Sequence, residues 1–569
     1  MKNKIICLLL VLVMCLTFVV SCGKDDGNTD GSGDSTGDTG STGNKPDKPD
    51  KPKPPVGGNT DEGERWWEDI TYEITSLRFQ MTDCSNLEEL PSGCARYLAG
   101  EKPENEDVDK YVAERNDEAL INTCIDSVTY VYYPDDANLY GYSRTIDLMY
   151  EAVMNPDSKT PDMFCNWMTD MLCTSLKGSF ANLYSRVRGE DDQYGKNYFD
   201  LSHPGYMAEL MGSLTLSQSK IYVIASDYFM DLIRAFFVVP VSVNLYNTIA
   251  EDMIDDLNDD GAYDINDFFE EVKNGDWTYD RLIQYAAKIY VDENKAIENE
   301  DPDDIMGFAL AKNGLISAGL VYTSSVSVIH RTPLDEGGFT YAYPAENQEL
   351  YNLSSAIANL VNQTGVMCVT DKGNDISVNT RVRTMFSTNR LLFGGVILVG
   401  SLEYEAYQEM KGVEDGGFGV VPVPVYKAGD RYLTQIHVVG RAGGIAHSTT
   451  KFAQCTAFLH YQSSNSAKVL NEYYDFQLTY DIADNLDGNV EMLEYIRENV
   501  RTSFDKLFED AVGFFYESTD PDAPKNRWHT LIVDNDYNVT NMRDYYTTIV
   551  PTKVNSLKEL VAQYQTLPD

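Results

Sequence analysis

Residues 256–267 place oxygen-bearing side chains at the spacing of a calcium-binding loop. Oxygen donors occupy loop positions one, three, five, nine and twelve, and glycine occupies position six, where the chain turns sharply. Position twelve is aspartate instead of the usual glutamate, and its shorter side chain weakens bidentate closure on the ion. An acidic loop without metal is the alternative in a chain of formal net charge -44. The only cofactor that the sequence suggests is therefore calcium, with the candidate ligands Asp256, Asn258, Asp260, Asp264 and Asp267.

Residues 64–569 lack the spacing patterns of several common catalytic sites. They contain no GxSxG nucleophile turn, no Walker phosphate loop and no HExxH zinc motif. The six histidines are not spaced as metal ligands. Carboxylates are plentiful, but no pair stands out as the acid and base of a hydrolase. We therefore expect a protein that is not an enzyme.

The first residues have the pattern of a secretion signal. Lys2 and Lys4 precede an apolar run over residues 5–20, which is too short for a membrane span, and Ser21-Cys22 follow. Residues 19–22 resemble the bacterial lipobox, in which the cysteine is acylated after cleavage. We therefore expect residues 1–22 to be a lipoprotein signal peptide and Cys22 to be the membrane anchor. The alternative is an ordinary signal peptide with an incidental cysteine.

Residues 23–63 consist almost entirely of Gly, Ser, Thr, Asn, Asp, Lys and Pro. Such a segment cannot bury a core, and as a random coil it reaches roughly 35 Å. A disordered tether of this kind holds a domain away from a membrane. It favours the outer face of a Gram-positive cell membrane, where no outer membrane confines a secreted binding protein.

The remainder, residues 64–569, is long enough for two lobes. The net charge of -44 repels nucleic acid and anionic lipid, so neither is an expected partner. We expect a monomer. Cys84 and Cys94 lie in one polar segment and are the only attractive local disulfide, with buried thiols as the alternative.

Hydrophobic spacing predicts alternating strands and helices, which is typical of an α/β fold with ligands in a crevice between lobes. Thr278 is an expected helix cap with Asp280 in the first turn. The expected strands are residues 70–81, 127–133, 161–165 and 418–424, and the expected helices are residues 108–124, 143–154, 279–290 and 451–462.

Several stretches resemble family 1 of the extracellular solute-binding proteins, which serve carbohydrate ABC transporters. Residues 237–247 (FVVPVSVNLYN) are similar to the family's crossing between lobes, and residues 274–280 (NGDWTYD) to its GxWTxD helix start. Residues 418–424, 437–446 and the helix after them are similar to its returning strand. Residues 82–106 look like an insertion, and the part after Thr519 matches loosely.

The resemblance implies a type II periplasmic-binding-protein-like fold with two α/β lobes, a hinge and an interlobe cleft. It places hinges near residues 238–244 and 435–440. The first lobe would hold residues from about 64 to 238 and about 440 to 515, and the second those from about 244 to 435, with the C-terminal remainder unassigned.

Sugar sites need aromatic faces for stacking and polar side chains for paired hydrogen bonds. The chain has 38 tyrosines against 22 phenylalanines, although half-buried core tyrosines explain most of them. The resemblance implies that Trp167 and Asp170 face the ligand, and each has an equally good structural explanation. The full candidate set is Asn166, Trp167, Asp170, Asp227, Tyr228, Tyr322, Ser324, Ser325, His437 and Arg441.

The resemblance implies capture of a sugar or oligosaccharide outside the cytoplasm and its delivery to ABC transporter permease subunits by hinge closure. A ligand-sensing or glycan-adhesion lipoprotein with the same fold is the alternative. A glycoside hydrolase is a weaker alternative because no carboxylate pair is singled out.

Overall fold

The computed structural model describes most of the chain after the expected tether. The described residues are 66–567 apart from 71, 83–92, 102, 104–105, 134–142, 185–195, 218–219, 259, 294–302, 312–316, 335–338, 370–377, 405–406, 408–409, 411–416, 438–439, 475–486, 515–527 and 534–537. Cys22 and Cys84 therefore lie outside the described residues. Lipid attachment and the disulfide stay predictions.

The first sheet has four strands in the order β13-β3-β1-β2. The first three strands along the chain are parallel, and β13 returns from far along the chain to pair antiparallel with β3. Consecutive parallel strands joined by helices are the arrangement that the spacing of apolar residues predicts. The strands are β1 (Thr75–Thr82), β2 (Ile125–Tyr133), β3 (Met163–Trp167) and β13 (Arg441–Ile445).

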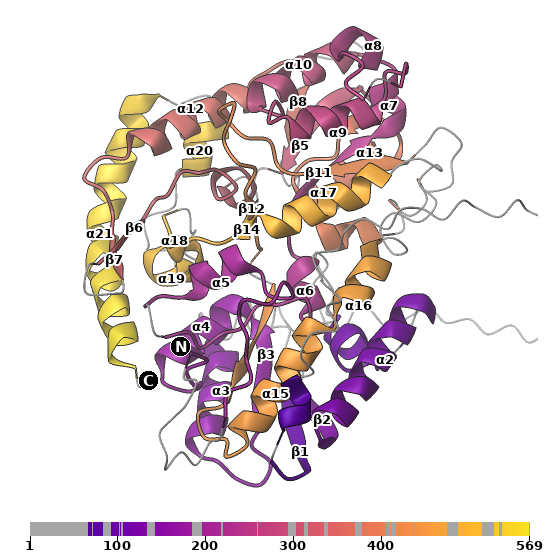
Figure 1. Cartoon of the computed structure of the whole chain (residues 1–569). Helices are drawn as coiled ribbons and strands as arrows, with labels where there is room; N and C mark the ends of the chain where they lie inside the picture. The colour runs from indigo at the N-terminus through magenta and orange to yellow at the C-terminus, as the bar shows by residue number, and fades with distance from the viewer. Residues whose placement is uncertain are drawn as a thin grey trace, which may run out of the picture. The chain divides into compact units, whose positions relative to one another are not determined.

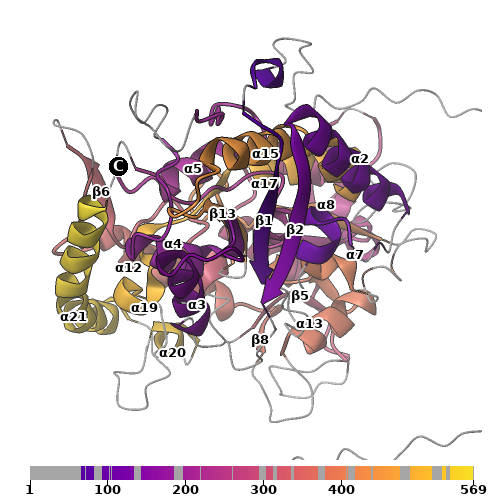
Figure 2. The same cartoon turned by 90° about the horizontal axis from the view of Figure 1, so that it is seen from below.

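Helices cover this sheet on two sides (Figure 2). In each pair one helix packs on the sheet, against β2 in one pair and against β3 and β13 in the other, and the second helix packs on the first. Both faces of the sheet are thereby shielded, and every residue of β3 and β13 is buried. The first pair is α2 (Glu106–Asn122) and α15 (Phe452–Ser464), and the second is α3 (Ser143–Met154) and α4 (Met168–Leu176).

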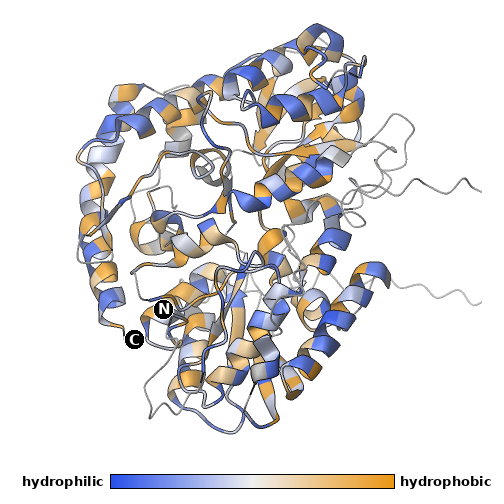
Figure 3. Ribbon diagram, in the orientation of Figure 1, coloured by the Kyte–Doolittle hydropathy of each residue, from blue (hydrophilic) through white to orange (hydrophobic). Residues whose placement is uncertain are grey.

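The second sheet has six strands, ordered β10-β4-β9-β5-β8 with β11 also paired to β4. It is mixed, because β5 runs parallel to β8 and β9 whereas β4 is antiparallel to β9, β10 and β11. Hydrophobic residues gather in the strands, and the helix faces turned outward are hydrophilic (Figure 3). The strands are β4 (Phe237–Ser242), β5 (Met306–Ala311), β8 (Val366–Val369), β9 (Leu391–Phe393), β10 (Ile397–Leu398) and β11 (Phe418–Val421).

The helix start NGDWTYD fixes α10 (Tyr279–Ile289) beside this sheet. Thr278 accepts a hydrogen bond from the Arg281 amide at 3.2 Å and so caps the helix as predicted. Trp277 is fully buried, and its indole donates to the Pro422 carbonyl at 2.9 Å. The motif therefore joins a helix end to the segment that follows β11.

Other helices surround the second sheet. Asn489 in α17 accepts from the Val420 amide at 2.8 Å, which holds this late helix against β11. The helices are α9 (Ile265–Lys273), α12 (Gln348–Val361), α13 (Val378–Ser387) and α17 (Asp487–Glu498).

Three segments meet between the sheets. The Val399 amide donates to the Phe236 carbonyl at 2.9 Å, and the His437 amide donates to the Ala235 carbonyl at 2.9 Å. Phe236 also pairs with Ile436 as an isolated bridge. The predicted hinge at residues 238–244 falls in β4 and α7 (Val243–Asn247), inside the second sheet, and the hydrogen bonds between the crossing segments lie just before it.

The last helix, α21 (Val539–Thr566), contacts elements that pack around each of the two sheets (Figure 1). Near its start, Tyr546 donates to the Pro344 carbonyl at 2.7 Å and its ring lies 5.8 Å from that of Tyr351 in α12. Near its end, Gln563 donates to the Leu176 carbonyl in α4 at 3.0 Å. With 28 residues the helix is about 42 Å long, enough to bridge the two lobes.

Every predicted strand and helix is present, with ends displaced by a few residues. In the described residues, no helix has the length and apolar character of a membrane span. The remaining elements are η1 (Trp66–Asp69), η2 (Cys94–Leu98), α5 (Ala208–Leu214), α6 (Met230–Ile233), α8 (Ala250–Met253), η3 (Ser317–Val321), β6 (His330–Pro333), β7 (Phe339–Ala342), η5 (Val399–Glu403), β12 (Thr434–Gln435), α16 (Ala467–Glu472), β14 (Val500–Arg501), α18 (Phe504–Leu507), α19 (Glu509–Val512) and α20 (Trp528–Val533).

Candidate ligand-binding groove

Two neighbouring cavities lie on either side of the start of α5. Ala208 and Glu209 line both of them, and consecutive residues of β14, Val500 and Arg501, line one each. The larger cavity has a volume of about 660 Å³ and the smaller one about 240 Å³. We call the two together the groove.

The larger cavity has walls from both lobes. On one side is α5, which is held to the first sheet through residues 224–226: Ile224 bridges Gly443 of β13, and the Ala225 amide donates to Met211 Sδ at 3.2 Å. On the other side is the β6–β7 hairpin, which precedes α12. Asn347, the cap of α12, donates to the Ser327 carbonyl at 2.9 Å. The cavity therefore lies between the lobes.

Aromatic rings form part of this wall. Tyr341 of β7 lies with its ring centre 4.2 Å from that of Phe504, and Phe339 lies two residues before it on the same strand. Side chains two apart on a strand point to the same face. The cavity thus presents a row of ring surfaces, which is what the apolar face of a sugar packs against.

Arg331 of β6 joins the hairpin to α5 across the cavity. Its guanidinium donates to the carbonyls of Gly212 and Thr215, each at 2.8 Å. It also lies over the ring of Phe339, 3.5 Å from the ring centre. A cation at the last carbonyls of a helix is favourable, so Arg331 holds the two walls together at the end of α5.

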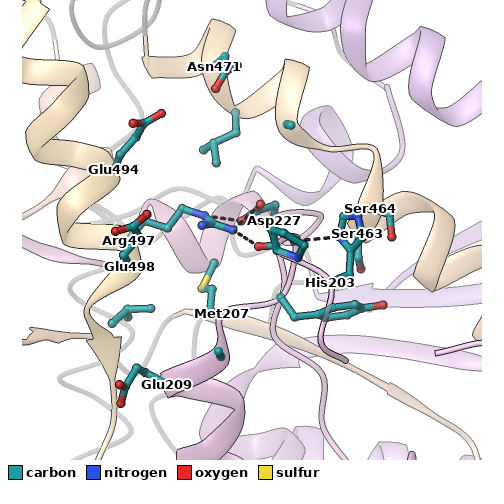
Figure 4. Close-up of a pocket in the computed structure, with 17 residues that line it drawn as sticks. His203, Met207, Glu209, Asp227, Ser463, Ser464, Asn471, Glu494, Arg497 and Glu498 are labelled. Carbon is teal, nitrogen blue, oxygen red and sulfur yellow. Dashed lines mark hydrogen bonds and ion pairs between the residues drawn. The ribbon is translucent and has the colours of Figure 1, made fainter. Parts of the chain in front are cut away.

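The smaller cavity is centred on an ion pair (Figure 4). Arg497 Nη2 lies 2.6 Å from Asp227 Oδ2, and Nε lies 2.8 Å from Oδ1, a bidentate arrangement. His203 accepts the Gly205 amide at 3.0 Å, and burial lowers the pKa of this histidine, so it lines the cavity as a neutral ring at pH 7. The carboxylates of Glu494 and Glu498 also line the cavity.

This ion pair connects the lobes. Arg497 belongs to α17, which is fixed to β11 and, through Glu491 and Lys273 at 2.7 Å, to α9. Asp227 belongs to the segment beside β13. A second link, between Glu209 and Arg431 at 3.1 Å, is exposed and therefore weaker. Two ion pairs, Asp227 with Arg497 and Glu209 with Arg431, thus lie at the groove.

The predicted residues at the end of β3 lie together but do not line either cavity. Asn166, Trp167 and Asp170 are all buried. Asn166 Oδ1 accepts the Trp167 amide at 2.8 Å, and Asn166 Nδ2 lies 3.5 Å from Asp170 Oδ2. The helix that follows, α4, packs against α18. Contact of the three residues with a ligand stays a prediction.

Tyr322, Ser324 and Ser325 lie next to the groove. Tyr322, a predicted residue of the second lobe, donates to Asp505 of α18 at 2.9 Å. This helix packs against α4. The Ser324 hydroxyl donates to the Val321 carbonyl at 2.6 Å, and that of Ser325 to Asp430 at 3.1 Å. Of the predicted residues, Asp227 is the one that lines either of the two cavities described above.

The other predicted residues belong to buried clusters. Tyr228 is fully buried with the Arg115 guanidinium 4.8 Å from its ring centre. Arg441 pairs with Asp231, which also accepts from Arg234 at 2.6 Å.

His437 lies where the three segments between the two sheets meet. Burial, with a smaller effect of Lys506, lowers the pKa of His437 to about 3, so its imidazole is neutral at pH 7.

The calcium-like loop is held by its own backbone. Asp256 accepts the amides of Asp260 and Gly261 at 3.2 and 2.9 Å, and Asp267 accepts those of Leu257 and Asp264 at 2.7 and 3.0 Å. Asp264 and Asp267 form the capping box of α9. In the described part of the chain, no three Asp, Glu, His or Cys side chains gather as metal ligands. Calcium binding by Asp256, Asn258, Asp260, Asp264 and Asp267 stays a prediction.

Comparison with solved structures identifies the architecture. The sugar-binding protein MalE from Xanthomonas citri superimposes with a TM-score of 0.51, at 11% identity, over 86% of this chain and 99% of that one. The chain has the two-lobed MalE fold. This confirms the predicted two-lobed α/β fold with an interlobe cleft.

Two further structures resemble the chain less closely. The GacH receptor of Streptomyces glaucescens, solved alone and with acarbose, gives a TM-score of 0.41 at 12% identity over 87% of this chain and 99% of that one. An extracellular solute-binding protein from Staphylococcus aureus, in complex with maltose, gives 0.45 at 10% identity over 87% and 98%. These proteins are binding proteins. No family model and no curated protein sequence matches the chain.

Sequence reasoning missed the residues that line the larger cavity. Aromatic residues alternate with the smaller Thr340 and Ala342 in residues 339–343 (FTYAY), a period of two that indicates a strand with rings on one face. That signal was available. Arg331 and Arg501 gave no signal, because only the fold brings them to one cavity.

Proposed function

We propose that this protein captures a sugar or oligosaccharide in the groove between its lobes. The observation that carries the proposal is the larger cavity, about 660 Å³, with aromatic rings and polar side chains on walls from both lobes. Ligand pockets commonly measure about 300 to 1,000 Å³. The smaller cavity adds hydroxyl, amide and carboxylate groups that suit the hydroxyls of a longer glycan.

The same proposal places the protein outside the cytoplasm. The apolar run over residues 5–20 and the following Ser21-Cys22 support export and acylation of Cys22, and residues 23–63 support a tether. A binding protein held in this way would deliver its ligand to the permease of an ABC transporter. Ligand capture and delivery need no catalytic group, in agreement with the lack of catalytic motifs in residues 64–569.

Binding would act through closure of the lobes. A ligand that contacts both α5 and the β6–β7 hairpin binds better when these walls are close, and that difference shifts the population toward the closed form. The ion pair of Asp227 with Arg497 and the hydrogen bonds of Arg331 are the contacts that opening would break. Small-angle scattering with and without a binding glycan tests closure, and an unchanged radius of gyration would contradict it.

A ligand screen tests binding itself. Isothermal titration and thermal shift of the protein with mono- and oligosaccharides should find a glycan that raises the melting temperature. Tyr341→Ala removes a ring from the cavity wall and should weaken binding about tenfold, since one aromatic contact is worth roughly 0.5 to 1.5 kcal/mol beyond its buried area.

Tyr426→Ala is the matched control. Tyr426 is bonded to Glu349 at 2.7 Å away from both cavities, so its loss should leave affinity unchanged. Equal losses in the two variants would contradict the placement of the site.

A further inference from the structure

Buried and half-buried arginines in this acidic chain generally contact carboxylates. Each of five forms an ion pair with an aspartate or glutamate, which offsets the cost of removing the guanidinium from water. The pairs are Arg96 with Asp109, Arg234 with Asp231 and Glu403, Arg281 with Glu271, Arg441 with Asp231, and Arg497 with Asp227.

Arg115 and Arg501 differ from these. Burial lowers the pKa of both, and neither has a carboxylate within 4 Å among the described residues. Arg115 is satisfied in another way: it donates to the Tyr97 carbonyl at 2.6 Å and to Ser466 at 3.1 Å, and it lies over the ring of Tyr228. It lines neither cavity.

Arg501 lines the larger cavity. Its Nη2 donates to the Ser324 carbonyl, and this is the one hydrogen bond of its guanidinium within the described part of the chain. The nearest acids are already engaged, since Glu209 pairs with Arg431 and Asp505 accepts from Tyr322. A guanidinium with remaining donors therefore faces an interlobe cavity.

A second positive charge lines the same cavity. Arg331 contacts only the backbone carbonyls of Gly212 and Thr215 and the ring of Phe339 among the described residues, so its charge is not balanced by a carboxylate. Glu209 is the one acidic residue among those that line this cavity, and it pairs with the exposed Arg431, so Arg331 and Arg501 leave the lining with an excess of positive charge.

We propose, resting on the proposed function, that the ligand is an acidic oligosaccharide whose sugar carboxylate pairs with Arg501. A guanidinium fork matches a planar carboxylate with two parallel hydrogen bonds. The rings of Tyr341, Phe339 and Phe504 then pack against the sugar faces on either side of the charge. Arg331 adds long-range attraction while it holds the hairpin to α5.

Isothermal titration with matched probes tests the inference. Oligogalacturonate, alginate and hyaluronan oligosaccharides supply carboxylates on different sugars, and the methyl ester of each supplies the same sugars without charge. We expect one acidic series to bind, its ester to bind about tenfold to a hundredfold more weakly, and its affinity to fall as salt rises.

Variants assign the effect to Arg501. Arg501→Met should remove the preference for acid over ester, and Arg501→Lys, which keeps the charge but not the fork, should lose part of it. Arg383→Met is the control, because Arg383 lies on α13 over Tyr404, outside both cavities. Melting curves of all three verify folding.

The outcomes separate the two proposals. If neutral glycans or the esters bind as tightly as the acids, the acidic ligand is contradicted while sugar capture stands. If an acidic glycan binds equally well to the Arg501→Met variant, the role of Arg501 is contradicted. If no glycan of either kind binds, both the inference and the proposed function fail.

Discussion

Arg497 and Arg501 lie four residues apart and line neighbouring cavities, but their surroundings differ. Arg497, in the last turn of α17, is held by both oxygens of Asp227, whereas Arg501, in β14, contacts the Ser324 carbonyl. The smaller cavity therefore contains its own counter-charge, and the larger one does not. The ion pair of Asp227 with Arg497 therefore links the lobes. Arg501 keeps guanidinium donors that are available to a ligand.

The largest expected effect on stability comes from breaking the ion pair of Asp227 with Arg497. Asp227→Ala leaves the partly buried Arg497 without its carboxylate and should lower the free energy of unfolding by about 3 to 5 kcal/mol. Urea denaturation at pH 7 measures this. The double variant Asp227→Ala with Arg497→Met should recover much of the loss, because no unpaired charge then stays buried. A cost below about 1 kcal/mol for the single variant would show that the pair is an ordinary surface contact.

The next effect concerns His460, which lies behind the smaller cavity. Its Nδ1 lies 2.7 Å from the Tyr206 hydroxyl, and burial lowers its pKa to about 4. The unfolded histidine titrates near 6.5, so the folded state binds fewer protons between these values and loses stability as pH falls from about 6.5 to about 4.

At pH 5 this histidine should account for about 2 kcal/mol of the loss relative to pH 7. The variant His460→Gln removes the titrating group, so its unfolding free energy should change less between pH 7 and pH 5, and urea titrations at the two pH values compare it with the parent. The exposed His330 on β6 provides the matched control substitution, His330→Gln. Identical pH dependence in all three proteins would contradict the role of His460.

A smaller effect is expected at the hairpin. Arg331→Ala removes two hydrogen bonds to carbonyls at the end of α5 and should destabilise that end by about 1 kcal/mol. Hydrogen exchange of the amides in residues 212–216 should become faster by several fold. Arg383→Ala, which also removes a guanidinium over an aromatic ring, should leave these amides unchanged. Unchanged exchange in the first variant would contradict the link.

The smallest effect completes the comparison. Arg501→Met replaces a half-buried guanidinium that has no carboxylate partner by an apolar chain of similar length, so the unfolding free energy should stay within about 1 kcal/mol and move toward greater stability. Denaturation without ligand measures this. A loss comparable to that of Asp227→Ala would mean that Arg501 has a structural role and would weaken its assignment to a ligand.

The fold could be predicted from the sequence because its signals are local. The alternation before Thr82, the helical spacing after Glu106 and the cap at Thr278 each depend on neighbouring residues, and each predicted element is present. The observed ends of these elements differ from the predicted ends where a residue is compatible with two kinds of secondary structure. Trp167, for example, extends β3 by two residues beyond the predicted end because β13 pairs with it.

The site was predicted less well because it depends on contacts between distant segments. Arg501 meets Ser324 across 177 positions, and Arg331 meets Thr215 across 116, so no spacing rule links them. The predicted Trp167 and Asp170 lie at the strand end as expected, but both are buried and line neither cavity, and α18 packs against the helix α4 that begins there. The role of an extra C-terminal segment cannot be found from a family pattern that matches it only loosely.

The two ends of α21 limit how the lobes can move. Its first turns bind beside α12, and its last residues bind Lys220 and Leu176, so one helix ties the surroundings of both sheets. A rotation of one lobe against the other must therefore carry the whole helix along or break the contacts at one of its ends. The docking of α21 thus sets how far the lobes can part.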